Sequence, residues 1–157
     1  MSSCTEDDTI PGVGGGGDTP PTVAISDISN TAVDGGTTIT FTVTASSGTN
    51  DLSSFTVTED GVNMEIDRYS IQEFTDNSIL LNNPQVLTGN DVNNFVFTVN
   101  ITVPSENLVP EEDTDYVYDV IVTDNTGESD TDFVTVTVFG VEIVDPCLLY
   151  TSPSPRD

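Results

Sequence analysis

The feature that most constrains the fold is the stretch 116–138, which predicts two long β-strands joined by a tight turn. Apolar side chains alternate along 116–123 and again along 132–138, namely Tyr116, Tyr118, Val120, Val122, Val134, Val136 and Val138. A period of two in β-branched and aromatic residues is what a half-buried strand requires. Between the strands, Asp124-Asn125-Thr126-Gly127 is typical of a turn, because Asp and Asn bond nearby backbone and glycine accepts positive φ. The stretch therefore predicts an antiparallel strand pair.

The rest of the chain repeats this alternation and has no long helical period. Further strands are predicted at 22–26, 38–45, 55–59, 62–69 and 93–103, with a shorter one at 79–81. Asp60-Gly61 predicts a hairpin that returns through 62–69, and Gly140 predicts a bulge in the last strand. The expected inward residues are Ile39, Phe41, Phe55, Val57, Phe95, Phe97, Tyr116, Val120, Val122, Val134 and Val136. Together these signals predict an all-β, antiparallel sandwich of about seven to eight strands.

Composition divides the chain into three parts. Residues 1–20 are rich in glycine and acidic groups and cannot bury much apolar surface, so they predict a disordered, flexible tether. Residues 21–145 contain the strand signals and form the predicted sandwich. Residues 146–157 depart from the acidic, threonine-rich composition before them, and we leave them out of the fold prediction.

The predicted closing strands carry a resemblance. The pattern Tyr116-x-Tyr118-x-Val120-x-Val122-x-Asp124, a turn with Gly127, and then Val134-x-Val136-x-Val138 is similar to the last two strands of PKD-like and related bacterial immunoglobulin-like domains. The Trp-Asp-Phe-Gly-Asp-Gly signature of PKD repeats is missing, so the resemblance is to the broader immunoglobulin-like group. It implies an immunoglobulin-like sandwich with a non-catalytic role at the cell surface.

The two ends of the chain carry further resemblances. Ser2-Ser3-Cys4 followed by Thr5-Glu6-Asp7-Asp8 resembles the mature start of a Bacteroidetes surface lipoprotein. That resemblance implies a lipid on Cys4 and an extracellular, outer-membrane or cell-surface location. The alternative is an ordinary disordered N-terminus with a stray cysteine. At the other end, 147–157 resembles translated sequencing-adapter read-through, and the alternative is a genuine short tail.

Charge excludes several function classes. The formal net charge is −25, with 27 carboxylates against Arg68 and Arg156, and there is no lysine or histidine. Nucleic-acid binding and docking on anionic lipid both need clustered basic residues, so any membrane contact is expected only through a lipid on Cys4. Histidine, lysine and a glycine-rich phosphate loop are missing, and nothing in the sequence distinguishes a catalytic carboxylate pair from the many solvated acids. We therefore predict that the chain is not an enzyme and holds no organic cofactor.

Calcium binding is more plausible than catalysis, because calcium is a hard cation that takes six to eight oxygen ligands. The first candidate site is the turn between the last two strands, with Asp124, Asn125, Glu128 and Asp130. A second acidic group is Glu111, Glu112, Asp113 and Asp115. Asp and Asn are also common in turns without any ion, so this simpler reading of the first group remains open.

The sequence thus predicts a non-catalytic, immunoglobulin-like surface module with an adhesion, binding or spacer role, whose partner is an extracellular protein or a glycan. One alternative is a carbohydrate-binding accessory lipoprotein of a polysaccharide-capture system, with Tyr69, Phe74 and Phe133 as the candidate aromatic contacts. Another is a structural subunit of a surface filament or adhesin, assembled by pairing of exposed edge strands.

Overall fold

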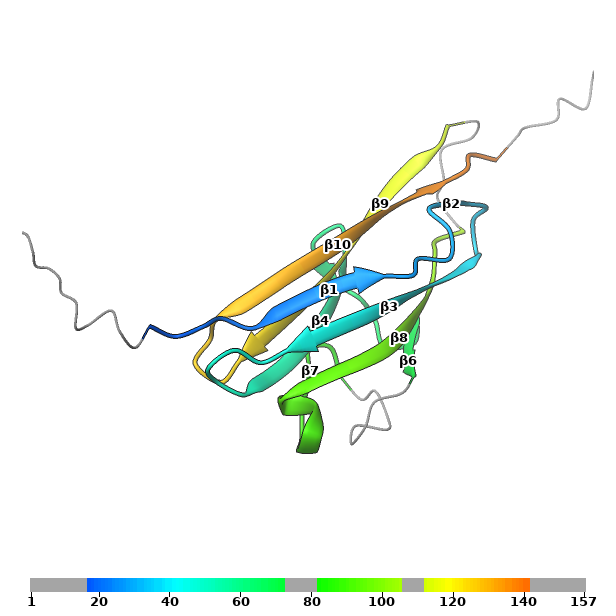
Figure 1. Ribbon diagram of the computed structural model, residues 1–157. Helices are drawn as coiled ribbons and strands as arrows, with labels where there is room; N and C mark the ends of the chain where they lie inside the picture. Colours follow the sequence, from blue (N-terminus) through cyan, green and yellow to red (C-terminus); the bar gives the residue numbers. More distant parts are fainter. Residues whose placement is uncertain (1–16, 73–81, 106–111, 142–157) are drawn as a thin grey trace, which may run out of the picture.

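Alternating β-branched and aromatic residues form two largely antiparallel sheets that pack face to face (Figure 1). The structure is a computed structural model, and it describes residues 17–72, 82–105 and 112–141. The first sheet has the strand order β1-β3-β8-β6. Its strands are β1 (Thr22–Ser26), β3 (Thr38–Ser46), β8 (Asn94–Thr102) and β6 (Tyr69–Gln72).

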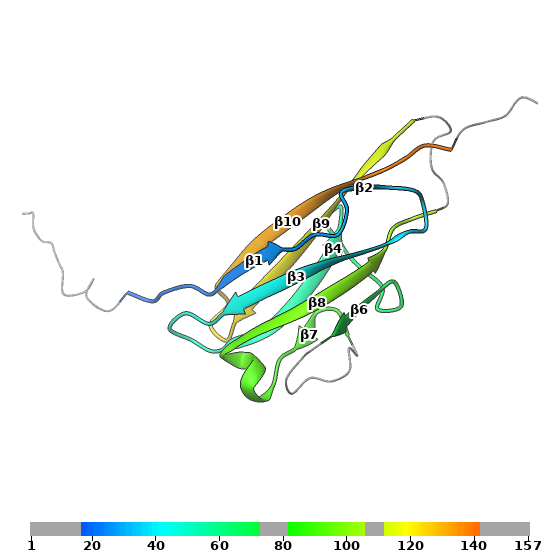
Figure 2. The same cartoon turned by 45° about the vertical axis from the view of Figure 1, so that its right-hand side comes forward.

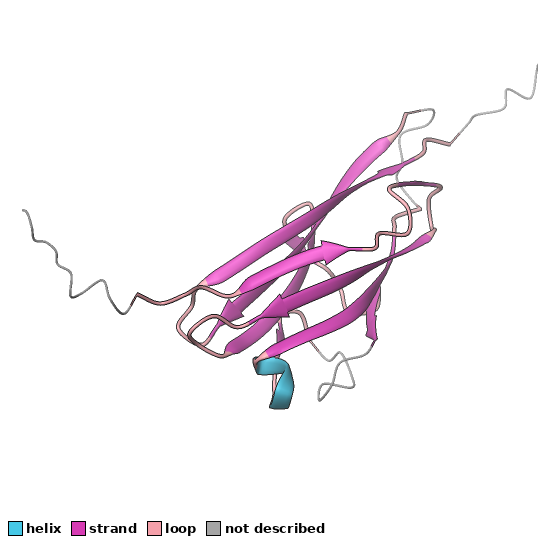
Figure 3. Ribbon diagram, viewed as in Figure 1, coloured by secondary structure: helices cyan, strands magenta, loops and turns pink. Residues whose placement is uncertain are grey.

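The second sheet is built on the three long strands β10, β9 and β4, which are Ser129–Val138, Thr114–Asp124 and Leu52–Glu59. Three two-residue strands complete it, namely β2 (Ala32–Val33) against β10, and β5 (Val62–Asn63) and β7 (Gln85–Val86) against β4. The orders β1-β3-β8-β6 and β10-β9-β4 are the A-B-E-D and G-F-C orders of the immunoglobulin sandwich. The predicted immunoglobulin-like, all-β class is therefore confirmed, and Figure 3 shows how strands dominate the chain.

The core lies between the sheets and contains the inward residues that alternation predicts. Phe55 meets Phe97 edge to face, with ring centroids 4.8 Å apart, and Phe95 stacks on Phe97 at 4.4 Å. Tyr118, Val120 and Val122 from β9 are fully buried, whereas Tyr116 is only half-buried. Each fully buried aromatic or aliphatic side chain contributes about 1.5–3 kcal/mol to folding.

The closing strand pair forms as predicted, while the hairpin after β4 does not. The strand that returns after Asp60-Gly61 ends after two residues, at Asn63, so the predicted strand over 62–69 is wrong. Met64 donates its backbone N–H to the Val57 carbonyl over 3.0 Å, and the chain then crosses to the other sheet, where β6 begins at Tyr69. This crossing buries both Met64 and Tyr69 between the sheets, which a straight hairpin would not do.

The predicted bulge at Gly140 is also wrong, because β10 ends at Val138. The backbone of Gly140 instead runs so close to Glu112 that a Cβ atom would clash with it, which explains the glycine. The short strand at 79–81, most of the tether and the tail 146–157 lie outside the described residues, and the domain limits 21 and 145 stay predictions. No helix in the described part of the chain is long and apolar enough to cross a membrane.

Candidate functional site

The turn between β9 and β10, the first candidate site, is organised by Asp124. This side chain is 2% exposed, although it lies at the end of the sandwich. Its Oδ1 accepts hydrogen bonds from the backbone N–H and the hydroxyl of Thr126, both at 2.8 Å, and from the backbone N–H of Glu128 at 2.9 Å. Gly127 has φ +98, a conformation that glycine adopts without strain. The hydrogen bonds to Asp124 Oδ1 therefore hold this turn together without any ion.

The environment of Asp124 favours its charged form. Burial acts to raise its pKa, but the hydrogen bonds from Thr126 and from the backbone of Glu128 and Gly127 outweigh burial and hold the pKa below its ordinary value. The other carboxylate oxygen, Oδ2, is buried and has no hydrogen-bond partner in the described structure.

Asp130, another predicted calcium ligand, reaches across to the other sheet. Its Oδ2 accepts a hydrogen bond from the backbone N–H of Val23 on β1 at 2.8 Å. Two residues further on, Oδ2 of Asp132 accepts one from Ile25 at 2.7 Å. Because both partners advance by two residues, β1 and β10 run in the same direction, side by side (Figure 1). We call this pair of contacts the β1 clamp.

The other predicted ligands do not gather around one point. The backbone N–H of Asn125 bonds the Asp51 carbonyl at 2.9 Å, and Glu128 is exposed. In the second group, Asp113 accepts a hydrogen bond from the Gly140 backbone and Asp115 accepts one from the Thr137 hydroxyl, while Glu111 lies outside the described residues. Within 17–72, 82–105 and 112–141, no group of three or more potential ligand side chains could hold a metal ion, so calcium stays a prediction.

A polar network that sequence reasoning missed joins Arg68, Glu59 and Tyr118. Two guanidinium nitrogens of Arg68 donate to the two carboxylate oxygens of Glu59, at 2.8 and 2.9 Å. The Tyr118 hydroxyl donates to the same carboxylate at 2.8 Å, and Arg68 also donates to the Thr102 carbonyl at 3.0 Å. These bonds connect β4 and β9 of one sheet with β8 of the other through the chain that precedes β6.

The network shifts the pKa values of all three side chains. Burial acts to raise the pKa of Glu59, but hydrogen bonds from Arg68 and Tyr118, together with the charge of Arg68, hold it below its ordinary value. Burial, followed by the hydrogen bond to Glu59, raises the pKa of Tyr118. The hydrogen bond to Glu59 raises the pKa of Arg68. The only basic residue in the described part of the chain is therefore already paired with a carboxylate.

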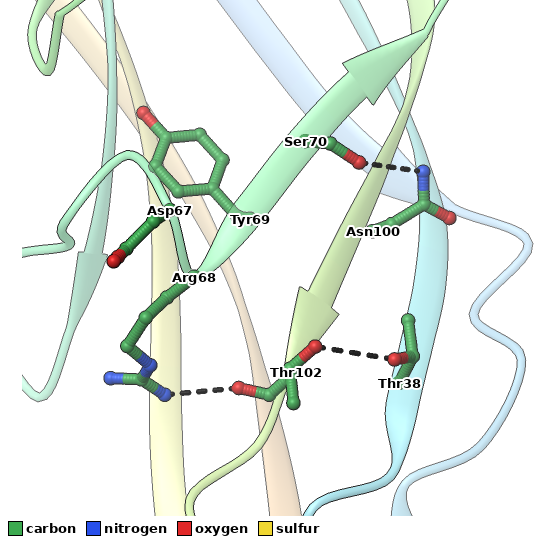
Figure 4. Close-up of a pocket in the computed structure, with 7 residues that line it drawn as sticks. All are labelled: Thr38, Asp67, Arg68, Tyr69, Ser70, Asn100 and Thr102. Carbon is green, nitrogen blue, oxygen red and sulfur yellow. Dashed lines mark hydrogen bonds between the residues drawn. The ribbon is translucent and has the colours of Figure 1, made fainter.

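Next to this network, a shallow pocket of about 230 Å³ opens on the outer side of the first sheet (Figure 4). Its lining is mostly polar and uncharged and consists of Thr38, Asp67, Arg68, Tyr69, Ser70, Asn100 and Thr102. The Asn100 amide lies 3.4 Å from the Ser70 hydroxyl, and the hydroxyls of Thr38 and Thr102 are 3.2 Å apart. The sequence did not predict this pocket, because its local pattern predicts a return strand over 62–69, whereas the chain leaves β4 after Asn63 and joins the other sheet at Tyr69.

The predicted aromatic contacts for carbohydrate do not share one surface. Tyr69 is buried, and its ring points away from the Asn100 amide in Figure 4. Phe133 is 60% exposed on the outer side of β10, in the other sheet. Phe74 and the predicted lipidation residue Cys4 lie outside the described residues. An aromatic sugar platform built from Tyr69 and Phe133 is therefore excluded by their positions.

No known protein family and no curated protein matches the sequence. Solved structures with a similar fold include the SrpA adhesin of Streptococcus sanguinis, at 18% identity and a TM-score of 0.45, over 88% of this chain and 62% of that one. They also include the PKD domain of an M14-like peptidase from a Thermoplasmatales archaeon, at 15% identity and a TM-score of 0.43, over 80% of this chain and 100% of that one. The major pilin subunit BcpA of Bacillus cereus is similar at 12% identity and a TM-score of 0.37, over 78% of this chain and 41% of that one.

Proposed function

We propose that the chain is a non-catalytic, immunoglobulin-like module that is held at the cell surface by an N-terminal tether with a lipid on Cys4, and that presents a binding surface away from the membrane. The observation that carries this proposal is the placement of the first and last strands. Since β1 and β10 run in the same direction, the chain enters the sandwich at one end and leaves it at the opposite end (Figures 1 and 2). A module with this geometry extends lengthwise between an anchor and whatever follows or binds it.

The electrostatics fit this placement. A net charge of −25 keeps the module soluble and repels it from anionic surfaces, so a flexible tether would hold it at a distance from the membrane. Carboxylates that clamp β1 also stabilise the strand to which the tether connects.

Assembly into a filament by edge pairing is the weaker alternative, because two sheet edges are already occupied. The free side of β4 is covered by β7 at Ser54 and Phe55 and by β5 at Thr58 and Glu59. Between them, the Asn83 side chain bonds both the N–H and the carbonyl of Val57. On the other sheet, the β1 clamp occupies N–H groups of the β1 edge.

Surface labelling of intact cells tests the proposal. An antibody against the sandwich should bind intact cells of the native host, and Cys4→Ala should release the protein into the medium or retain it inside the cell. Ser3→Ala, next to the predicted lipidation residue, is the matched control. Labelling that requires permeabilised cells, or that is unchanged by Cys4→Ala, would contradict the proposal.

A further inference from the structure

The charges of this protein are divided unequally between its two sheets. None of the residues in β1, β3, β6 and β8 is charged. The other sheet carries carboxylates on each of its long strands, at Glu59, Asp115, Asp119, Asp124, Asp130 and Asp132. In a chain with 27 carboxylates, a four-stranded sheet without any of them creates a distinct surface.

The outward side chains of this sheet form rows of hydroxyl and amide groups. Strand register places Thr40, Asn100 and Ser70 in one row, and Thr42, Thr98 and Gln72 in the next. We call the outward side of β3, β8 and β6, with these two rows at its centre, the neutral face. The polar pocket lies at one end of this face, beside Ser70 and Asn100 (Figure 4). Among the described residues, the carboxylates that flank this face lie in loops, such as Asp67 before β6.

The chemistry of the neutral face selects one class of ligand. Hydroxyl and amide groups both donate and accept hydrogen bonds, as do the hydroxyls of a sugar. An anionic ligand would be repelled by the net charge, and Arg68 is paired with Glu59. Protein interfaces are enriched in aromatic residues, Met and Arg at their centre, whereas the large exposed apolar side chain among these three strands is Val96 alone.

We propose that the neutral face binds a neutral polysaccharide, with one sugar unit in the pocket at Ser70 and Asn100 and the polymer running along the strands, across the two rows. Successive rows are about 7 Å apart along the strands, so the face extends well beyond the pocket and offers contacts to several sugar units. This inference rests on the proposed function, because it names the partner of the surface module.

Native electrophoresis in gels that contain polysaccharide tests the proposal, since the acidic protein migrates readily without any label. Separate gels would contain a neutral glucan, a neutral mannan, a neutral galactan and the anionic polygalacturonate. We expect retardation in at least one neutral gel and none in polygalacturonate. Retardation in no neutral gel, or equal retardation in the anionic gel, would overturn the proposal.

Two charge-matched variants locate the site. Asn100→Asp places a carboxylate on the neutral face, and Thr135→Asp places one on the outer side of β10, near Asp115 and Asp119 of the neighbouring strand β9. Loss of the hydrogen bonds at Asn100 should weaken binding about tenfold in Asn100→Asp, while Thr135→Asp binds as wild type. Equal binding by both variants would overturn the site.

Two further measurements distinguish loss of the binding site from unfolding of a variant. Thermal melts show whether each variant is folded, and amide chemical shifts of the wild-type protein with an oligosaccharide of the retarding polymer should change along β3, β8 and β6. Changes confined to β4, β9 and β10 would overturn the site without using any variant. If the antibody labels intact cells but no neutral gel retards the protein, only the sugar proposal is contradicted. If a neutral gel retards the protein but intact cells are not labelled, only the surface role is contradicted.

Discussion

The carboxylate of Asp132 on β10 accepts a hydrogen bond from the backbone N–H of Ile25 on β1 over 2.7 Å. Asp130 does the same for Val23 over 2.8 Å. These aspartates replace the backbone carbonyls that a neighbouring strand would supply, and they close an edge that could otherwise pair with another chain. Part of the acidic composition of this protein is therefore structural, and a net charge alone does not reveal it.

We predict that Asp132→Ala lowers the free energy of unfolding by about 1–3 kcal/mol, because it leaves the Ile25 N–H without its charged acceptor. The measurement is chemical unfolding at neutral pH. Glu65→Ala is the control, since it removes one exposed carboxylate and lies outside the contacts between β1 and β10. Hydrogen exchange of the Ile25 amide should accelerate in Asp132→Ala only. Equal exchange in the two variants would show that the clamp does not hold β1.

The network of Glu59, Arg68 and Tyr118 predicts a specific pH dependence. The pKa of Glu59 is lowered in the folded protein, so its charge adds stability above the unfolded value near 4.5 and that stability is lost as the pH falls towards the folded pKa. Glu59→Gln should therefore cost about 1–2 kcal/mol near neutral pH, a value towards the low end because Arg68 is partly exposed to solvent.

The difference between wild type and Glu59→Gln is the quantity to measure, because protonation of the other carboxylates relieves repulsion in both proteins alike. Unfolding free energies are compared near neutrality and below pH 4.5, the ordinary pKa of glutamate. We expect the difference to shrink at the lower pH. A constant difference across this range would mean that the charge of Glu59 contributes nothing.

Local alternation was enough to predict the sheets, but not the contacts that give this sandwich its particular surface. The period of two correctly predicts burial of Val120, Val122, Val134 and Val136. Alternation between adjacent residues is enough to show which face of a strand is buried. Arg68 meets Glu59 only because the chain crosses between sheets after Met64, and no local pattern shows that crossing. The rows of the neutral face depend on the pairing of β6 with β8, two strands that lie far apart in the sequence.

The predicted calcium site at the turn between β9 and β10 has a direct thermal test. An ion that binds only the folded state raises the melting temperature with its concentration. If calcium binds here, calcium chloride should raise the melting temperature more than sodium chloride of equal ionic strength, and chelator should reverse the change. Glu128→Gln is the informative variant, because Glu128 is exposed and Asp124 is needed for the turn itself. An identical transition in calcium and in chelator would remove calcium from this turn.

The two buried tyrosines predict a loss of stability in alkaline solution. Burial raises the pKa of Tyr69 and of Tyr118 above the ordinary value of 10.0. Their neutral forms therefore add stability that is complete below pH 10.0 and falls as the unfolded chain ionises at higher pH. Tyr118→Phe and Tyr69→Phe should each lose less stability than wild type between neutral pH and pH values above 10.0.

At neutral pH these two variants should differ in their effect on the free energy of unfolding. Tyr118→Phe removes a hydroxyl that donates to Glu59 and should cost about 1–2 kcal/mol. The Tyr69 hydroxyl is buried with no hydrogen-bond partner in the described structure, so Tyr69→Phe should be neutral or stabilising. Chemical unfolding of both variants checks this, and equal destabilisation would show that the Tyr69 hydroxyl has a partner in solution.

The Asn83 side chain completes the edge of β4 where no strand does. Its Oδ1 accepts the Val57 N–H at 3.1 Å, and its Nδ2 donates to the carbonyls of Val57 and Met64 at 2.6 and 2.9 Å. Asn83→Ala should lower the free energy of unfolding by about 1–3 kcal/mol, because it leaves the Val57 N–H of β4 without its acceptor. The exposed edge should also promote self-association, which light scattering at high salt would detect once the charge repulsion is screened. Asn82→Ala is the matched control, since its backbone N–H rather than its side chain bonds Gln85. Equal stability and equal scattering of the two variants would mean that the β4 edge is protected by β5 and β7 alone.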